Sequence, residues 1–197
     1  MNYLAHAVLS FQHPEILTGN MICDFVKGSQ QYQYSPGIQN GIRLHREIDQ
    51  FTDKHLATKE AKKIFQPATG KYAAPLIDIV YDHFLCIDEK ETPQLGWDWF
   101  SLGVYEHLTA QKSVLPASFC SILPHMIQYN WLANYHHTAN IEKSFHSIAK
   151  RSRYFSNPAE AFDLFVRKYD DLQTSYSVFF PEVKNYAFEL LNSFVKV

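Results

Sequence analysis

The chain has 197 residues, of which 46% are hydrophobic and 15% aromatic, and its formal net charge is −2. This length and composition predict one globular domain over residues 1–197 with a bulky aromatic core. The charge excludes a global basic field for nucleic acid. Because the sequence has neither a polybasic tail nor a run of 18 apolar residues, we also expect no membrane association. The oligomeric state is left open.

The cysteine pattern and the first residues of the sequence indicate in which cellular compartment the protein works. Cys23, Cys86 and Cys120 are far apart, odd in number and without a C-x-x-C pair, which favours free thiols over disulfides or a zinc knuckle. The start of the sequence lacks the basic residues and continuous apolar stretch of a signal peptide. Together these features predict a cytoplasmic protein.

Helical spacing of apolar residues dominates the sequence, and alternating strand patterns are scarce. We expect Gly28 to end the second helix, Pro67 to end the third segment, which is one long helix or two joined ones, and Pro181 to open the last helix. The expected helices cover residues 2–11, 15–27, 35–65, 75–87, 97–111, 116–135, 157–180 and a final segment from 181. The predicted fold class is all-α, a compact helical bundle of a single domain.

Acids and imidazoles in apolar surroundings are concentrated in the first 83 positions. Asp24 lies between Cys23 and Phe25, and Asp82 and His83 interrupt a nearly continuous apolar run. An unpaired carboxylate buried in such a place costs several kcal/mol, so it requires a cation, a paired group or a metal ion. The four stretches concerned are Asn2–His6, Gly19–Phe25, His45–Asp53 and Tyr81–Phe84.

The spacing of these residues predicts a site for a divalent cation. His45 and Asp49 are four residues apart and share a helix face, which Asp53 continues, and Asp78 and Asp82 have the same spacing. Imidazole and carboxylate together suit Mn²⁺, Fe²⁺ or Zn²⁺, and a carboxylate-rich shell favours Mn²⁺ or Mg²⁺. Such an ion would polarise a phosphoryl group and activate water.

Structural roles compete with this interpretation. The segment from His45 to Asp49 is also typical of a solvated helix face with local ion pairs. His136 and His137 project about 100° apart on a helix, so we interpret this pair as a helix end. The remaining histidines are expected to be structural: His13, His55, His107, His125 and His146.

Four blocks of sequence, in order, resemble the acyl carrier protein phosphodiesterases. They are Met1–His6, Gly19-Asn20 with Asp24–Gly28, Gly41-Ile42 with His45-Arg46, Ile48-Asp49 and Thr52-Asp53, and Asp82–Leu85. The likeness continues through Trp131-Leu132 with Tyr135 and Tyr169-Asp170 with Phe180-Pro181.

The resemblance implies an all-α fold distantly related to the HD-domain phosphohydrolases. It implies hydrolysis of holo-acyl carrier protein to apo-protein and 4'-phosphopantetheine, with Mn²⁺ or Mg²⁺, in a bacterial cytoplasm. One departure is that HD-domain enzymes carry neighbouring ligands in the order His-Asp, whereas this chain has Asp82-His83.

The family resemblance and the local chemistry together suggest roles for individual residues. The expected metal ligands are His6, Asp24, His45 and Asp82. Asp49 and His83 are expected to orient ligands or transfer protons, and Arg46 to bind phosphate through a bidentate guanidinium. Acyl carrier proteins are acidic helical bundles, so basic residues should form the docking patch. The candidates are Lys27, Arg43 and Arg151, with Lys59, Lys62, Lys63, Lys71, Lys150 and Arg153.

Two other functions are compatible with the sequence. One is a phosphohydrolase of the same architecture that acts on a nucleotide or another small phosphoester. The other is a non-catalytic helical adaptor that binds an acidic partner, in which the acids and histidines are structural and metal has no role. Release of the arm from holo-acyl carrier protein distinguishes the leading function from both.

Overall fold

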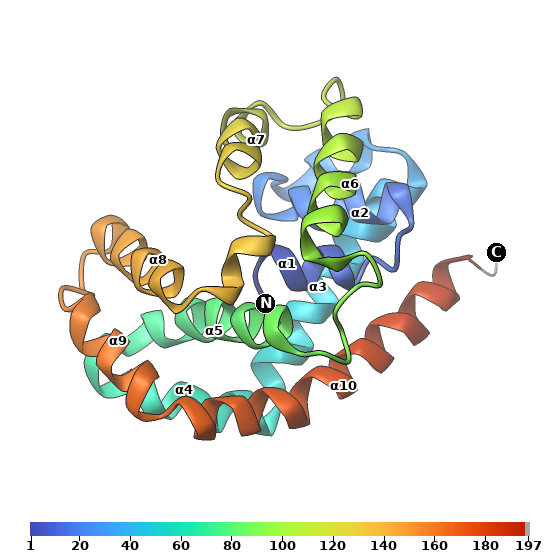
Figure 1. The fold of residues 1–197 in the computed structure, drawn as a ribbon. Coiled ribbons are helices and arrows are strands. Elements are labelled where there is room, and N and C mark those ends of the chain that lie inside the picture. Colours follow the sequence, from blue (N-terminus) through green and yellow to red (C-terminus); the bar gives the residue numbers. More distant parts are fainter. Residues whose placement is uncertain (196–197) are drawn as a thin grey trace.

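The computed structural model describes residues 1–195, and these fold into helices joined by short turns, with no strand (Figure 1). The α-helices are α1 Tyr3–Val8, α2 Pro14–Ile22, α3 Pro36–Lys54, α4 Leu56–Thr69, α5 Ala73–Ile87, α6 Gly96–Ala110, α7 Ala117–Gln128, α8 Thr138–Arg151, α9 Pro158–Arg167 and α10 Tyr169–Val195. Short 3-10 segments are η1 Cys23–Phe25, η2 Gly28–Gln33, η3 Gly70–Tyr72 and η4 Ala133–His136. The predicted all-α class is confirmed.

The buried apolar side chains form one continuous cluster that runs through all the α-helices. α5 is its centre, since nearly every side chain from Leu76 to Cys86 is buried, and α10 packs along α3, α4 and α5 (Figure 1). The predicted single domain over 1–197 extends two residues beyond the described part. None of the described helices is long and apolar enough to cross a membrane.

Two prolines that were predicted to end or begin a helix lie inside helices instead. Pro67 lies inside α4, which ends only at Gly70, where φ is +55°. Pro181 lies inside α10, and the break that was expected there falls instead at Lys168, between α9 and α10. A proline removes one helical hydrogen bond, but most helical stability in a protein comes from packing of the apolar face. Phe179, Phe180 and Val183 are buried on both sides of Pro181, which explains why α10 continues.

The region after α7 also differs from the prediction. The expected helix to residue 135 ends at Gln128, and a separate helix, α8, follows the 3-10 segment η4. Ile141 and Phe145 form the buried stripe of α8. His136 ends η4, so the interpretation of the His136-His137 pair as a helix end is confirmed.

α2 and α3 cross at a pair of glycines. A Cβ atom on Gly19 would lie 2.1 Å from the carbonyl oxygen of Ile38, and one on Gly41 would lie 2.3 Å from that of Ile16. Only glycine permits backbones to approach this closely. The crossing places Asn20, the residue after Gly19, against His45, one helical turn beyond Gly41.

The start of α1 is attached to α5 through Asp82. The buried Asp82 carboxylate accepts hydrogen bonds from the backbone N–H groups of Asn2, Leu4 and Ala5, at 3.2, 2.8 and 3.4 Å. These are amides at the N-terminus of a helix, which have no partners within the helix itself. Asp82 thereby holds α1 in place, and α1 carries His6 into the interior.

Candidate metal centre

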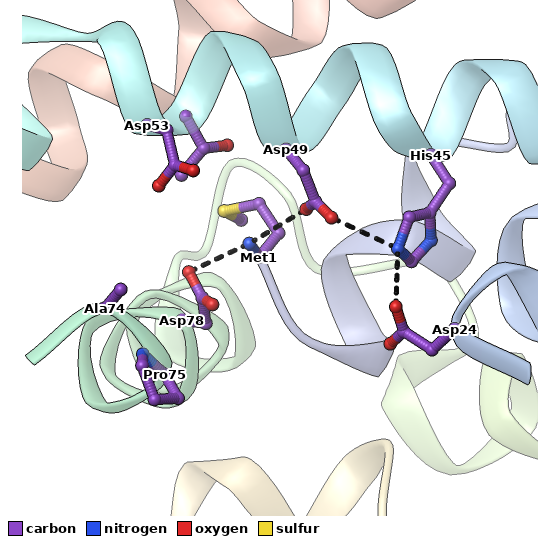
Figure 2. Close-up of a pocket in the computed structure, with 9 residues that line it drawn as sticks. Met1, Asp24, His45, Asp49, Asp53, Ala74, Pro75 and Asp78 are labelled. Carbon is purple, nitrogen blue, oxygen red and sulfur yellow. Dashed lines mark hydrogen bonds and ion pairs between the residues drawn. The ribbon is translucent and has the colours of Figure 1, made fainter. Parts of the chain in front are cut away.

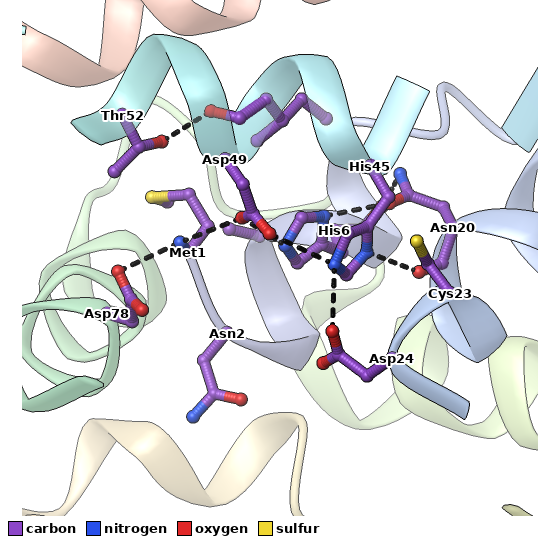
Figure 3. Close-up of polar contacts among 12 residues, drawn as sticks. Met1, Asn2, His6, Asn20, Cys23, Asp24, His45, Asp49, Thr52 and Asp78 are labelled. Carbon is purple, nitrogen blue, oxygen red and sulfur yellow. Dashed lines mark hydrogen bonds and ion pairs between the residues drawn. The ribbon is translucent and has the colours of Figure 1, made fainter. Parts of the chain in front are cut away.

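Two histidines and an aspartate from two helices meet beside the second half of α3, with His6 on α1 and both His45 and Asp49 on α3. One ligand atom from each of His6, His45 and Asp49 lies within 4.8 Å of the others. Asp49 Oδ1 is 3.4 Å from His6 Nε2, and Asp49 Oδ2 is 3.2 Å from His45 Nε2 (Figure 3). Asp24, from η1, completes the group, with Oδ1 3.5 Å from His45 Nε2. Four side chains from α1, η1 and α3 therefore converge.

The cluster is buried on the histidine side and open on the carboxylate side. His6 and His45 are 3% and 6% exposed, whereas the Asp24 and Asp49 side chains are 70% and 45% exposed. The carboxylates face a cavity of about 250 Å³, which Asp53 and Asp78 also line (Figure 2). Asp78 accepts from the amino group of Met1 at 2.9 Å. A small ligand entering the cavity would meet oxygen atoms first and imidazole nitrogens behind them.

The two imidazole rings are stacked. Their centroids are 3.8 Å apart, and the ring planes differ by 9°. Each Nδ1 atom faces an oxygen of Asn20, the side-chain Oδ1 for His6 at 2.8 Å and the main-chain oxygen for His45 at 2.7 Å (Figure 3). Both Nε2 atoms consequently point toward the carboxylates. Among the described residues, His6 Nε2 is a buried nitrogen with no hydrogen-bond partner.

The charges of the cluster are strongly coupled. Burial lowers the pKa of His45, but its hydrogen bonds and charge interactions with Asp24 and Asp49 outweigh burial and raise that pKa to about 9. Burial and the neighbouring His45 lower the pKa of His6 to about 4. The pKa of Asp49 lies well below its ordinary value, because the hydrogen bond from His45 and the charge of the Met1 amino group overcome the effect of burial. The hydrogen bond from His45 likewise lowers the pKa of Asp24.

This arrangement fits a divalent cation. Two carboxylates share one imidazolium, and metal ligation requires a neutral imidazole, so a cation would take the place of the proton on His45. It would also give His6 Nε2 the partner that it lacks. A donor set of two imidazoles and two carboxylates is typical of sites for Mn²⁺, Fe²⁺ or Zn²⁺, whereas Mg²⁺ prefers oxygen alone.

The structure brings together three of the four expected metal ligands, His6, Asp24 and His45. Asp82 is not part of the cluster, because both of its oxygens are engaged by the amides of α1. Burial raises the pKa of Asp82 to about 7. Asp49, which the sequence suggested for an orienting or proton-transfer role, is instead the carboxylate that contacts both histidines.

The expected catalytic residues lie in different places. His83 is buried away from the cluster, with Nδ1 2.7 Å from the Tyr135 carbonyl oxygen and Nε2 2.8 Å from the Tyr169 hydroxyl. Both of its nitrogens are thus occupied. Arg46 lies at the edge of the site, where it donates to Gln31 Oε1 at 2.7 Å. Of these two residues, His83 and Arg46, only Arg46 lies beside the metal centre.

The candidate docking residues are also dispersed. Burial, together with the charge of Asp24, raises the pKa of the Tyr3 hydroxyl to about 12, while the charge of Arg151 lowers it. Arg43 faces α10, with its guanidinium 5.1 Å from the centre of the Phe194 ring. Lys27 is exposed after η1. Asn20 was not among the predicted site residues. Its position directly after Gly19, within one of the four stretches that the sequence singled out, was the feature that could have indicated it.

The fold and this centre define a class of protein, namely an all-helical chain with a His/Asp site suited to a divalent cation. The family model for acyl carrier protein phosphodiesterase matches residues 1–183. The chain therefore belongs to the acyl carrier protein phosphodiesterase family.

Individual relatives agree with this assignment. Proteins named acyl carrier protein phosphodiesterase include one from Klebsiella pneumoniae that is 29% identical over 188 residues, covering 95% of this chain and 97% of the relative. One from Photorhabdus laumondii is 29% identical over 182 residues, covering 92% of each chain. No match was found among solved structures. The expected kinship with HD-domain enzymes therefore stays a prediction.

Proposed function

We propose that this protein is a metal-dependent phosphodiesterase that converts holo-acyl carrier protein to apo-protein and 4'-phosphopantetheine in the bacterial cytoplasm. Water adds to phosphorus, the bond from phosphorus to the serine oxygen breaks, and that oxygen takes up a proton. The observation that carries the proposal is the convergence of His6, His45, Asp49 and Asp24 on one cavity in a chain of this family.

We assign His6 Nε2, His45 Nε2 and Asp49 as the inner ligands, with Asp24 on the open side of the centre. Of the two ions that the family resemblance implies, we assign Mn²⁺ rather than Mg²⁺, because two imidazoles are a poor match for Mg²⁺. When bound, such an ion supplies Lewis-acid polarisation of the phosphoryl group and activation of water near neutral pH. Burial of both histidines excludes competing water from the rear of the centre.

Arg46 is placed to hold the phosphodiester. Its guanidinium is fixed by Gln31 and lies beside the sulfur of Cys23, one residue from Asp24. A planar guanidinium binds phosphate oxygens in a bidentate manner. Burial raises the pKa of the Cys23 thiol to about 11, so this cysteine remains protonated and is not a nucleophile.

Metal removal tests the proposal. Purified protein is incubated with holo-acyl carrier protein and Mn²⁺, with and without a chelator, and the mass of the carrier protein is measured. We expect loss of the 4'-phosphopantetheine mass with Mn²⁺, and a reduction of more than about a hundredfold when the ion is withheld. Full activity in chelator would contradict the metal assignment. Cleavage of small phosphoesters, with the carrier protein left intact, would favour the nucleotide-type phosphohydrolase.

The acidic carrier protein also needs a docking surface. We assign it to a basic patch defined as Lys71, Lys150, Arg151 and Arg153, two of which, Lys71 and Arg153, lie against the exposed ring of Tyr154. Lys71 Nζ and the Arg153 guanidinium each lie 5.5 Å from the centre of the Tyr154 ring. Within the described part of the chain, no member of the patch forms an ion pair. The charges of Arg151 and Asp24 both act on the pKa of Tyr3, which supports a position of the patch on the side of the centre where Asp24 lies.

Charge reversal at Arg151 tests the docking assignment. Arg151→Glu is expected to raise KM for holo-acyl carrier protein about tenfold at low salt with little change in kcat, because a rim charge acts mainly on association. The difference from the unaltered protein should shrink as salt increases. Arg43→Glu, the same charge change on the α10 side, is the matched control and should leave KM unchanged. Equal effects of the two variants would refute the patch.

A further inference from the structure

We propose that Asn20 is the positioning residue of the metal centre and that, through two different oxygens, it fixes the tautomer of both histidine ligands. This inference rests on the proposed metal-dependent function, but the hydrogen bonds that carry it belong to the protein alone. Asn20 is fully buried.

The two bonds define which ring nitrogen carries hydrogen. The Asn20 side-chain oxygen lies 2.8 Å from His6 Nδ1, and its main-chain oxygen lies 2.7 Å from His45 Nδ1. An amide oxygen only accepts hydrogen bonds, so each Nδ1 must be the donor. Each Nε2 is then the atom free to bind a cation, and both Nε2 atoms face Asp49.

The orientation of the Asn20 amide is itself fixed. Its Nδ2 donates to the main-chain oxygen of His6 at 2.8 Å and to Ser10 Oγ at 3.0 Å. Ser10 Oγ in turn donates to the same His6 oxygen at 2.8 Å, so it is free to accept from Nδ2. A flipped amide would set two oxygens against each other and lose both bonds. The side-chain oxygen therefore has one stable position, which faces His6.

The position of the main-chain oxygen follows from the helix crossing. Asn20 is in the last turn of α2, where carbonyl groups lack partners within the helix. The close approach at Gly19 and Gly41 places this carbonyl against His45 on α3. With every side-chain polar atom already bonded to the protein, Asn20 does not contact substrate or ion. Its role is to hold the two stacked rings with their Nε2 atoms on one side.

The two bonds can be separated by mutation, because only one of them uses the side chain. In metal-free Asn20→Ala, ¹⁵N NMR of the histidine rings should show that His6 loses its single Nδ1–H tautomer, while His45 keeps the Nδ1–H group that is bonded to the main-chain oxygen. The Mn²⁺ affinity should fall by about 10- to 100-fold, as for other groups that orient metal-bound histidines. Asn20→Asp retains the acceptor for His6 Nδ1 and, with its second oxygen protonated, a donor in place of Nδ2, so it should restore the Nδ1–H tautomer of His6. A merely structural role for Asn20 would not produce this difference between the two rings.

Controls separate this inference from general destabilisation and from the proposed function. Thr18→Val removes another, partly buried hydrogen bond of α2, to His107 at 2.8 Å, and should leave the Nδ1–H groups of both histidines and the Mn²⁺ affinity unchanged. Should Asn20→Ala fail to fold, Ser10→Ala, which removes one anchor of the same amide, should broaden the His6 tautomer signal. An unaltered His6 tautomer in Asn20→Ala, or in Ser10→Ala where that variant replaces it, overturns the inference. If the unaltered protein binds no Mn²⁺, the proposed function fails, while the metal-free tautomers still test Asn20.

Discussion

Replacing His45 with alanine is expected to lower the turnover of holo-acyl carrier protein by about a thousandfold or more, a loss typical of removing a central catalytic group. His45 Nε2 lies 3.2 Å from Asp49 and 3.5 Å from Asp24, so its removal leaves two carboxylates without the group between them. Both the bound ion and the alignment of the acids depend on it.

The measurement is the rate of release of 4'-phosphopantetheine by the folded variant, with helical circular dichroism as a check. The exposed His146, on α8, provides the matched control, and His146→Ala should retain normal turnover. A His45→Ala variant that keeps more than a tenth of the activity would exclude this histidine from the centre.

Replacing Asp82 with alanine is expected to act mainly on folding. Three backbone amides of α1 would lose their acceptor, and each buried unsatisfied group costs about 1–3 kcal/mol. We therefore expect the free energy of unfolding of the metal-free protein to fall by about 3 kcal/mol or more. Urea denaturation measures this directly. Asp163→Ala is the control. The Asp163 carboxylate on α9 is exposed and has no hydrogen-bond or ion-pair partner among the described residues, so this change should leave the free energy of unfolding nearly unaltered.

Asp82→Asn distinguishes an anchoring role from the ligand role that the sequence suggested. Asparagine keeps one oxygen acceptor for the α1 amides and removes the charge. We expect the stability to drop by less than in the alanine variant, and the Mn²⁺ affinity of the folded protein to change by no more than about threefold. A loss of affinity as large as that expected for His45→Ala would restore Asp82 to the metal centre.

The sequence predicted the helical class correctly because apolar periodicity reports which face of each helix is buried. It failed at Pro67 and Pro181, where packing of neighbouring side chains outweighs the lost hydrogen bond. It also missed α8, whose buried stripe of Ile141 and Phe145 is short. Local residue preferences cannot reveal these outcomes, since contacts distant in sequence decide them.

The site was predicted in part for a similar reason. The spacing of His45 and Asp49 placed both on one face of a helix, and the apolar surroundings of Asp82 indicated that its buried carboxylate needs a partner. The apolar neighbours of Asp24 suggested burial as well, but the Asp24 side chain is 70% exposed. Sequence could not identify that partner. For Asp82 it is the start of α1, about 80 residues away along the chain, which a helix pattern does not report. The same limitation concealed Asn20, whose importance depends on how α2 crosses α3.

The central claim is that His6, His45 and Asp49 hold one divalent cation. An anomalous difference map from crystals soaked in Mn²⁺ tests it most directly, because manganese is identified by its own scattering. The proposed centre predicts one peak bonded to Nε2 of both histidines and to the Asp49 carboxylate, with Asp24 on its open side. A peak bonded to Asp82, or one that touches neither imidazole, would contradict it.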